Sequence, residues 1–325
     1  MRPFRYERAA DEGGAVAAVA EPGAKFLGGG TNLVDLMRLG VETPSVLVDV
    51  TRLPLDRIEP LADGGLRIGA GVRNSDLAAD PRIRERYPAL AEAVLAGASG
   101  QLRNLATTGG NLMQRTRCPY FQDVTTPCNK REPGTGCPAR EGEHSNLAIL
   151  GHSEHCVATN PSDMAVALAA FDAVVRVVGP DGAREIPLVE FHRLPGDAPQ
   201  CDTVLRDGEL IVAVDLPRLP LAVHSHYRKV RERASFAFAL VSVAAAVEVA
   251  DGRVADARIA FGGLAHKPWR ATAAEEALRG AAAGPEAFAA AADAELAAAR
   301  PLRDNGYKVG LARTALVQTL VELTS

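Results

Sequence analysis

The chain has 325 residues, of which 47% are hydrophobic and 23% charged, and its formal net charge is −4. These values predict a folded protein of two or three domains and argue against a surface for nucleic acid or anionic membranes. The N-terminus has no apolar stretch typical of a signal peptide, and no apolar run is long enough to cross a bilayer.

The first fifty residues have the pattern of a βαβ-like unit. A short strand is predicted at residues 24–27, followed by three glycines, a helix at 31–38 and a second strand at 45–50. Thr31 and Asn32 suit the start of that helix, since both residue types favour helix N-termini.

Between residues 55 and 216 the pattern changes to short strands mixed with helices. Alternation predicts strands at 66–72 and 173–178, and helical spacing predicts helices at 88–96 and 163–171. Within this block, residues 116–146 are rich in Pro, Cys, Gly and charge and show little periodicity. A loop of that length inside a globular domain usually has a functional reason or is disordered.

The last hundred residues read as strands followed by helices. Strands are predicted at 225–230, 238–249 and 255–261, and alanine-rich helices at 272–325 with interruptions near Gly284 and Pro301. This order predicts a separate α+β domain at the C-terminus.

Two glycine-rich turns could bind phosphate. The first, Gly28-Gly29-Gly30-Thr31-Asn32, stands between a strand and a helix, where backbone amides can approach an anion. A nicotinamide Rossmann motif is disfavoured, because Leu33 occupies the position of its third glycine. The second turn, residues 106–112, repeats the same chemistry. Together the turns could clamp one pyrophosphate, or they could be two unrelated structural turns.

Several motifs resemble, in order, the FAD-binding (medium) subunits of molybdenum hydroxylases, the xanthine dehydrogenase and aldehyde oxidoreductase family. They are KFLGGGTNLVDLM at 25–37, RNLATTGGNL at 103–112, NPSDM at 160–164, YRKVRERASFA at 227–237, VSVA at 241–244 and FGGLAHKPWR at 261–270. The resemblance spans nearly the whole chain. It implies an α+β protein with a two-subdomain FAD-binding fold, like that of vanillyl-alcohol oxidase (PCMH-like), followed by a small α+β domain of antiparallel sheet and helices. The expected boundaries are 1–55, 56–220 and 221–325, with an inserted iron–sulfur loop at 115–157.

The resemblance also implies which residues bind FAD. The first turn would embrace the pyrophosphate and ribose, the second would face it, Ser162 and Asp163 would contact the adenosine end, and Lys229 would lie near the flavin ring, where a cation stabilises negative charge. The full expected set is Lys25, Phe26, Leu27, Gly28, Gly29, Gly30, Thr31, Asn32, Leu33, Thr107, Thr108, Gly110, Asn111, Ser162, Asp163 and Lys229.

Four of the five cysteines, Cys118, Cys128, Cys137 and Cys156, bracket the irregular segment, whereas Cys201 stands apart. Four thiolates suit tetrahedral zinc or a [4Fe–4S] cluster, and the wide spacings do not discriminate between them. Two disulfides, or isolated buried thiols, are the structural alternatives. His144, His152 and His155 keep a mixed Cys/His zinc site open, although we expect them to be ordinary surface histidines.

The stretches RTRCPYF at 115–121, PCNKR at 127–131 and GTGC at 134–137 resemble the flavin subunit of bacterial periplasmic aldehyde oxidoreductase. That resemblance implies a [4Fe–4S] cluster held by Cys118, Cys128, Cys137 and Cys156, with Cys201 free. A minority of the family, including 4-hydroxybenzoyl-CoA reductase, carries such an inserted loop.

As a whole, the resemblance implies an electron-transfer subunit that works in a heterotrimer. A large molybdopterin-binding subunit would oxidise an aldehyde or N-heterocycle, and a small [2Fe–2S] subunit would pass electrons to FAD here and on to an external acceptor. Neither nucleic acid nor membrane insertion is expected. The compartment would be the periplasm, reached on a partner's twin-arginine signal, or the cytoplasm. The alternatives are a stand-alone FAD oxidoreductase and a non-catalytic binding module stapled by zinc or disulfides.

Overall fold

The computed structural model describes residues 1–325 and begins with a three-stranded parallel sheet in the order β1-β3-β2. Its elements are β1 (Arg5–Arg8), α1 (Glu12–Val19), β2 (Ala24–Leu27), α2 (Leu33–Arg38) and β3 (Val46–Asp49). Strand β3 is the central strand and is buried on both faces. This explains why its sequence is a continuous apolar run rather than an alternating one. The first glycine turn therefore lies at the carboxyl end of β2.

The middle of the chain forms a five-stranded antiparallel sheet in the order β4-β5-β8-β6-β7, with helices packed against it. The strands are β4 (Ile58–Pro60), β5 (Leu66–Gly69), β6 (Val174–Gly179), β7 (Gly182–Pro187) and β8 (Leu210–Leu216). The helices are α3 (Asn74–Ala79), α4 (Pro81–Arg86), α5 (Pro88–Ala96), α6 (Gly100–Arg103), α7 (Thr108–Leu112), α9 (Asp163–Ala170) and α10 (Leu188–Phe191). Helix α9 is buried along its whole length, at the centre of the largest hydrophobic core.

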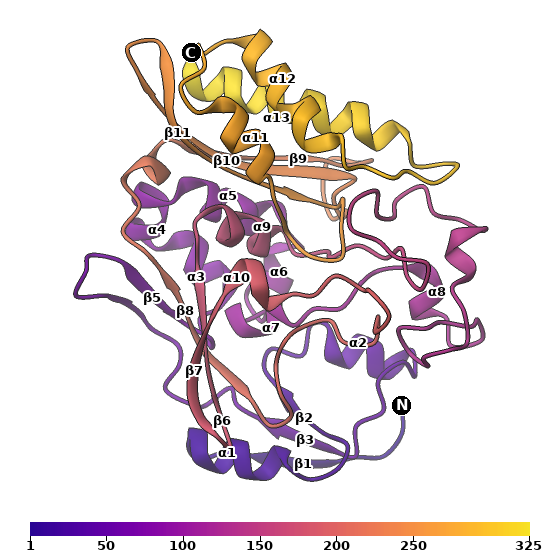
Figure 1. Cartoon of the computed structure of the whole chain (residues 1–325). Coiled ribbons are helices and arrows are strands. Elements are labelled where there is room, and N and C mark those ends of the chain that lie inside the picture. The colour runs from indigo at the N-terminus through magenta and orange to yellow at the C-terminus, as the bar shows by residue number, and fades with distance from the viewer.

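Residues 113–162 form a long, mostly irregular excursion on one side of the molecule (Figure 1). Its only regular pieces are α8 (Pro119–Gln122) and the short 3-10 helix η1 (Pro138–Arg140). The excursion has a small hydrophobic core of its own, which includes Cys118, Phe121, Cys128 and Cys156. The irregular segment expected from composition is therefore ordered around its cysteines.

The C-terminal part is a four-stranded antiparallel sheet in the order β12-β11-β10-β9, covered by helices on its outer face (Figure 1). Its elements are the 3-10 helix η2 (Pro220–Val223), β9 (Ser225–Val230), β10 (Val241–Ala250), β11 (Arg253–Gly262), β12 (Trp269–Arg270), α11 (Thr272–Leu278), α12 (Pro285–Leu296) and α13 (Tyr307–Thr324). This confirms the expected fold class of an FAD-binding α+β part followed by an α+β C-terminal domain.

Side chains on β10 alternate between two cores, as strand geometry requires. Ala244 and Ala246 pack into the core around α5 and α9, whereas Val243, Ala245 and Val247 pack under α11–α13. The C-terminal sheet is thus a shared layer. It is less separate from the rest of the chain than the order of strands and helices suggested.

Two further expectations differ in detail from the structure. Strand β10 begins at Val241 rather than at residue 238, because residues 231–240 form an irregular stretch. Strand β1 was not predicted, because its sequence, Arg-Tyr-Glu-Arg, does not alternate between apolar and polar residues. None of its four residues is buried. It pairs with β3 at the edge of the sheet.

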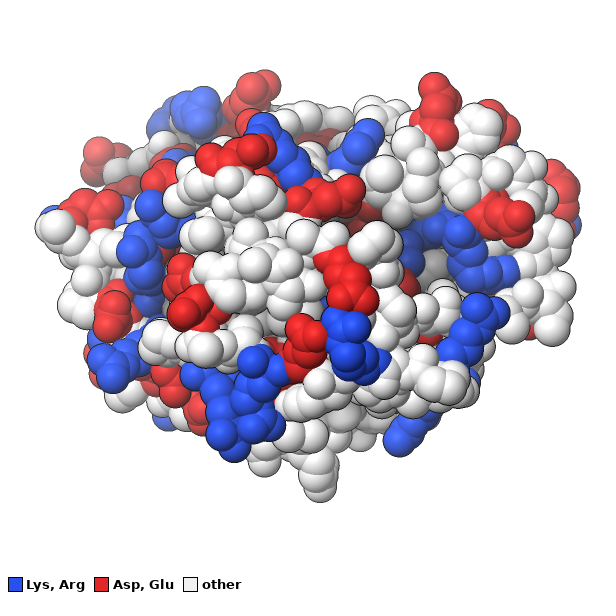
Figure 2. Space-filling model, turned by 90° about the horizontal axis from the view of Figure 1, so that it is seen from below, with Lys and Arg blue, Asp and Glu red and all other residues white.

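Charges of both signs are interspersed on the face shown in Figure 2. None of the helices combines the length and apolar composition needed to cross a bilayer.

Candidate functional site

The two glycine-rich turns lie against each other. A Cβ atom added at Gly29 would stand 1.9 Å from the carbonyl oxygen of Leu105, and one added at Gly28 would stand 2.9 Å from Thr107 Oγ1. Real Cβ atoms do not approach a backbone oxygen this closely, so only glycine allows the turns to touch. The fold thereby brings together two motifs that are almost eighty residues apart.

The second turn is fixed by hydrogen bonds to the neighbouring sheet. Thr107 is the N-cap of α7 and accepts a hydrogen bond from the Gly110 N–H at 3.2 Å. The Thr108 hydroxyl donates to the Val72 carbonyl at 3.1 Å, and the Gly109 N–H donates to the Ala70 carbonyl at 2.9 Å. These bonds use Thr107 and Thr108 to hold the turn in place.

A cleft of about 740 Å³ opens beside these turns and reaches the C-terminal sheet. The expected FAD-binding residues that line it are Thr31, Asn32, Gly110, Asn111, Ser162, Asp163 and Lys229. The others do not line it: Lys25, Phe26, Leu27, Gly28, Gly29, Gly30, Leu33, Thr107 and Thr108. Most of the first motif is therefore partly exposed outside this cleft, and Lys25 forms an ion pair with Glu42.

A buried polar network forms the part of the wall where α9 begins. Lys229 Nζ donates to Asp163 Oδ2 at 2.8 Å, and the Tyr227 hydroxyl donates to Asp163 Oδ1 at 2.6 Å. Ser162 is the N-cap of α9, and its hydroxyl also donates to Asn111 Oδ1 at 2.7 Å. Burial raises the pKa of Tyr227 well above its usual value, so it remains the hydrogen-bond donor to Asp163. Lys229 and Asp163 thus form a buried ion pair in the cleft wall.

The cleft fits a dinucleotide-sized cofactor in size and in polarity. Its volume lies within the range of roughly 300–1,000 Å³ typical of ligand sites. Two buried polar atoms of its lining residues, Asn74 Oδ1 and Ser242 Oγ, have no hydrogen-bond partner in the protein. Such atoms cost free energy unless a ligand or water satisfies them. Asn74 was not singled out from the sequence, because a lone Asn carries no spacing signal, and Ser242 lies in the quoted motif VSVA but was not expected to bind FAD.

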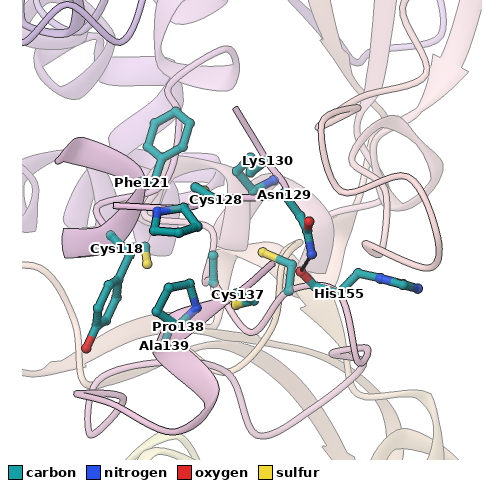
Figure 3. A pocket seen from close by; sticks show the side chains of 13 residues that line it. Cys118, Phe121, Cys128, Asn129, Lys130, Cys137, Pro138, Ala139 and His155 are labelled. Atoms are coloured by element: carbon teal, nitrogen blue, oxygen red, sulfur yellow. Dashed lines mark hydrogen bonds between the residues drawn. The ribbon is translucent and has the colours of Figure 1, made fainter. Parts of the chain in front are cut away.

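Cys118, Cys128, Cys137 and Cys156 surround one small cavity in the irregular segment (Figure 3). All five cysteines of the chain are free thiols, so the disulfide alternative is wrong for this structure. Burial raises the pKa of Cys118 to about 11. His266 Nε2 lies 3.2 Å from Cys156 Sγ, and the side chain of Lys130, almost fully buried, also lines the cavity.

No three His, Cys, Asp or Glu side chains come close enough together to hold a single metal ion. The thiols thus share a cavity without the tight tetrahedral grouping of a zinc site, whose ligands lie about 2.0–2.3 Å from the ion. Four thiols around one cavity are soft donors, of the kind that bind zinc or iron–sulfur clusters.

The expectation of ordinary surface histidines is wrong for His144 and His152, both of which are buried. The His144 Nε2 atom accepts a hydrogen bond from the Asp304 N–H at 3.1 Å, and its Nδ1 lies 3.0 Å from the Ala139 carbonyl. His152 Nε2 lies 2.6 Å from the Arg300 carbonyl. These imidazoles connect the cysteine segment to the C-terminal domain. His155 lines the cysteine cavity and is half-exposed.

A chain of ion pairs anchors the cysteine segment to the frame of the cleft. Arg115 donates to Glu42 Oε1 at 2.7 Å and to Asp202 Oδ2 at 2.8 Å, and Asp202 also pairs with Lys130. Lys25 completes the chain at Glu42. Burial alone would raise the pKa values of Glu42 and Asp202, but the adjacent cations hold both below their usual values.

Residues 2–219 match the family of FAD-binding domains in molybdopterin dehydrogenases, and residues 225–323 match the C-terminal domain of CO dehydrogenase flavoproteins. The chain belongs to this family of flavoprotein subunits. It is 53% identical to the aldehyde oxidoreductase FAD-binding subunit PaoB of Escherichia coli (strain K12), over 99% of this chain and 98% of that protein.

Two other relatives are less similar in sequence to this chain. The medium chain of glyceraldehyde dehydrogenase from Sulfolobus acidocaldarius is 26% identical over 78% of this chain and 73% of its own length. Among solved structures, the carbon monoxide dehydrogenase of Hydrogenophaga pseudoflava aligns with a TM-score of 0.77 and 28% identity, covering 99% of this chain and 98% of that chain. The subunit is thus an FAD-binding medium subunit of a molybdenum hydroxylase, and the stand-alone and non-catalytic alternatives lose their support.

One buried cation of this flavoprotein subunit has no acidic partner. Lys308, at the start of α13, is fully buried and donates to the carbonyls of Asn146, Leu147 and Gly263 at 3.1, 3.0 and 2.6 Å. All three acceptor residues line the large cleft. Lys308 therefore joins the C-terminal helix, the cysteine segment and the cleft wall. Burial lowers its pKa to about 7.

We expect this lysine to make the stability of the subunit depend on pH. With a folded pKa of about 7 and an ordinary value of 10.5, the unfolded chain binds one more proton than the folded chain between these pH values. The contribution of Lys308 to the free energy of unfolding therefore rises with pH between these values, by roughly a few kcal/mol. Urea unfolding of wild type and Lys308→Met at pH 7 and pH 10 measures the difference. An unchanged difference between the two proteins at both values would contradict the assignment.

Proposed function

We propose that this chain is the FAD- and [4Fe–4S]-carrying electron-transfer subunit of a heterotrimeric molybdenum hydroxylase that oxidises aldehydes. The observation that carries the proposal is the 53% identity to an aldehyde oxidoreductase FAD-binding subunit over nearly the whole of both chains. At this level of identity and coverage, the loops and the inserted segment align together with the core.

The expected partners are a large molybdopterin-binding subunit, where the aldehyde reacts, and a small subunit with [2Fe–2S] centres. The support for such partners is that the relatives are themselves named as subunits or medium chains of larger enzymes. Electrons would leave this subunit to an external acceptor. N-heterocycles are the alternative substrate class, and the periplasm or the cytoplasm stays the prediction for the compartment.

We propose that FAD occupies the 740 Å³ cleft, with subdomains 1–55 and 56–220 on either side of it and domain 221–325 closing one end. FAD supplies the exchange of electrons one or two at a time. The chain's own contribution is to hold and surround it. Thr31, Asn32, Gly110 and Asn111 present small polar groups at the turns, and the other expected residues keep these turns in contact.

Around the flavin ring, Lys229 would contribute positive charge, steadied by Asp163, which also accepts from Tyr227. A cation at that position favours negative charge on a neighbouring group. Lys25, Phe26, Leu27, Gly28, Gly29, Gly30, Leu33, Thr107 and Thr108 would act mainly by shaping the site. This division of roles refines the set of contacts that the motifs alone implied.

We further propose that Cys118, Cys128, Cys137 and Cys156 bind a [4Fe–4S] cluster as thiolates. The supporting observations are their shared cavity, their freedom from disulfides, and the nearby cation Lys130, whose charge favours ionised thiols. Binding requires that all four thiols lose their protons. His266, beside Cys156, is kept neutral by burial, which lowers its pKa well below its usual value.

The test is an anaerobic absorption spectrum with iron and acid-labile sulfide assays on wild type, Cys128→Ser and Cys201→Ser. We expect flavin bands with a broad cluster shoulder and about four irons per chain in wild type. Cys128→Ser should lose most of the iron, while Cys201→Ser should keep it, because Cys201 is exposed and lies outside the cavity. Flavin without iron would refute the cluster, and folded protein without flavin would refute the FAD assignment.

A further inference from the structure

Arg117 stands between the two cavities of the subunit. Its side chain lines the large cleft, and the next residue, Cys118, lines both the cleft and the cysteine cavity. The Arg115 N–H, two residues earlier, donates to Asn32 Oδ1 at 2.9 Å. The stretch from Arg115 to Cys118 is therefore fixed against the first glycine turn, on the side that faces the cleft.

The guanidinium of Arg117 has no anionic partner in the protein. It makes no ion pair, its only hydrogen bond goes to the Arg115 carbonyl, and it stacks over the Phe238 ring at 4.9 Å. Arg115 nearby has two carboxylate partners. The Arg117 side chain is half-buried, so its guanidinium lines the cleft with donors that no carboxylate of the protein satisfies. Such a cation is available to an anionic ligand.

We propose that Arg117 binds an anionic group of the FAD, either the pyrophosphate or the negatively charged edge of the reduced ring. The cleft around it is lined by Asn32, Gly110 and Asn111, which belong to the two phosphate-type turns. A guanidinium presents several donors to such oxygens and is the side chain best suited to them. This inference rests on the proposed function, because it assumes FAD in the cleft.

Arg117 then differs in origin from the residues that the motifs supply. It comes from the cysteine segment, so flavin binding and the order of that segment are coupled through one dipeptide, Arg117-Cys118. An occupied cleft would neutralise the guanidinium next to the first cluster thiolate. Loss of the segment's structure would in turn remove a cation from the flavin site.

The experiment compares Arg117→Met and Arg117→Lys with Arg86→Met in the full chain. Arg86 is a matched control, because its half-buried guanidinium also stacks over an aromatic ring, Tyr87, and donates to a backbone carbonyl, but it does not line the cleft. FAD is removed and titrated back to give Kd, and the flavin midpoint potential is measured by dye equilibration. We expect Arg117→Met to weaken FAD binding by about 10- to 100-fold, Arg117→Lys to recover part of the loss, and Arg86→Met to change little.

Riboflavin, which lacks the pyrophosphate, separates the two anionic groups. A pyrophosphate contact leaves riboflavin affinity and the midpoint potential unchanged in Arg117→Met, whereas a ring contact lowers the potential. Urea unfolding of the FAD-free chains excludes a merely structural role, since Arg117→Met should be as stable as wild type or more so. A destabilised FAD-free Arg117→Met, or FAD affinity and potential equal to those of wild type, would overturn the proposal. Wild-type protein without FAD would instead refute the proposed function.

Discussion

Gly29→Ala is expected to weaken FAD binding by roughly 10- to 100-fold, the effect of an overpacked contact costing about 1–3 kcal/mol. The added Cβ would lie 1.9 Å from the Leu105 carbonyl oxygen and 3.2 Å from the Ala106 Cα. Both are backbone atoms, so no side chain can turn away to relieve the clash. The two turns must separate, and Asn32 and Asn111 would then no longer face the same cofactor.

Fluorescence titration of the FAD-free protein with FAD measures this effect. Gly310→Ala is the control, because a Cβ there meets nothing within 4 Å and Gly310 lies inside the helix α13. Alanine is the better helix former, so that variant should bind FAD normally and be as stable as wild type or slightly more so. Normal FAD affinity in Gly29→Ala would show that contact between the turns is dispensable.

Asp202→Ala is expected to lower the free energy of unfolding by about 3 kcal/mol, the lower end of the range for breaking a buried ion pair. The carboxylate serves both Arg115 and Lys130, and the Lys130 side chain is only 2% exposed. Removing it leaves the Lys130 ammonium with only the Pro199 carbonyl, at 2.7 Å. The lower end applies because Asp202 is itself 31% exposed and water can partly replace it.

Urea unfolding of wild type and Asp202→Ala measures this loss. Asp293→Ala is the matched control, because the Asp293–Arg313 pair is exposed on both sides. Exposed pairs contribute less than about 1 kcal/mol. Equal stabilities of Asp202→Ala and Asp293→Ala would show that the ion-pair chain around Arg115 does not anchor the segment.

Positioning and contact are distinct roles in this site, and the sequence motifs do not separate them. The first motif contributes the turn, but Lys25 pairs with Glu42 and the glycines pack against the second turn. Conversely, Asn74, Arg117 and Ser242 line the cleft although none of them was among the expected FAD-binding residues. A sequence motif indicates which residues the site requires together. Whether a given residue lines the cleft or only positions its neighbours depends on how the chain packs.

The sequence alone determined the local structure wherever one periodic signal dominated. Helices α5 and α9 and strand β9 lie within one residue of their predicted ranges, because the spacing of apolar residues acts over a few neighbouring positions. The ordered series of motifs also determined the family.

Only the tertiary structure decided which distant groups meet. The contact of Gly29 with Leu105, the pairing of Arg115 with Glu42 and Asp202, and the burial of Lys308 join residues far apart in the chain. No local pattern encodes such contacts, because they depend on how sheets and helices pack after each has formed. The same reason applies to His144 and His152. They were predicted to lie at the surface because the sequence around them is charged and irregular. In the structure they are buried by packing against residues 300–304.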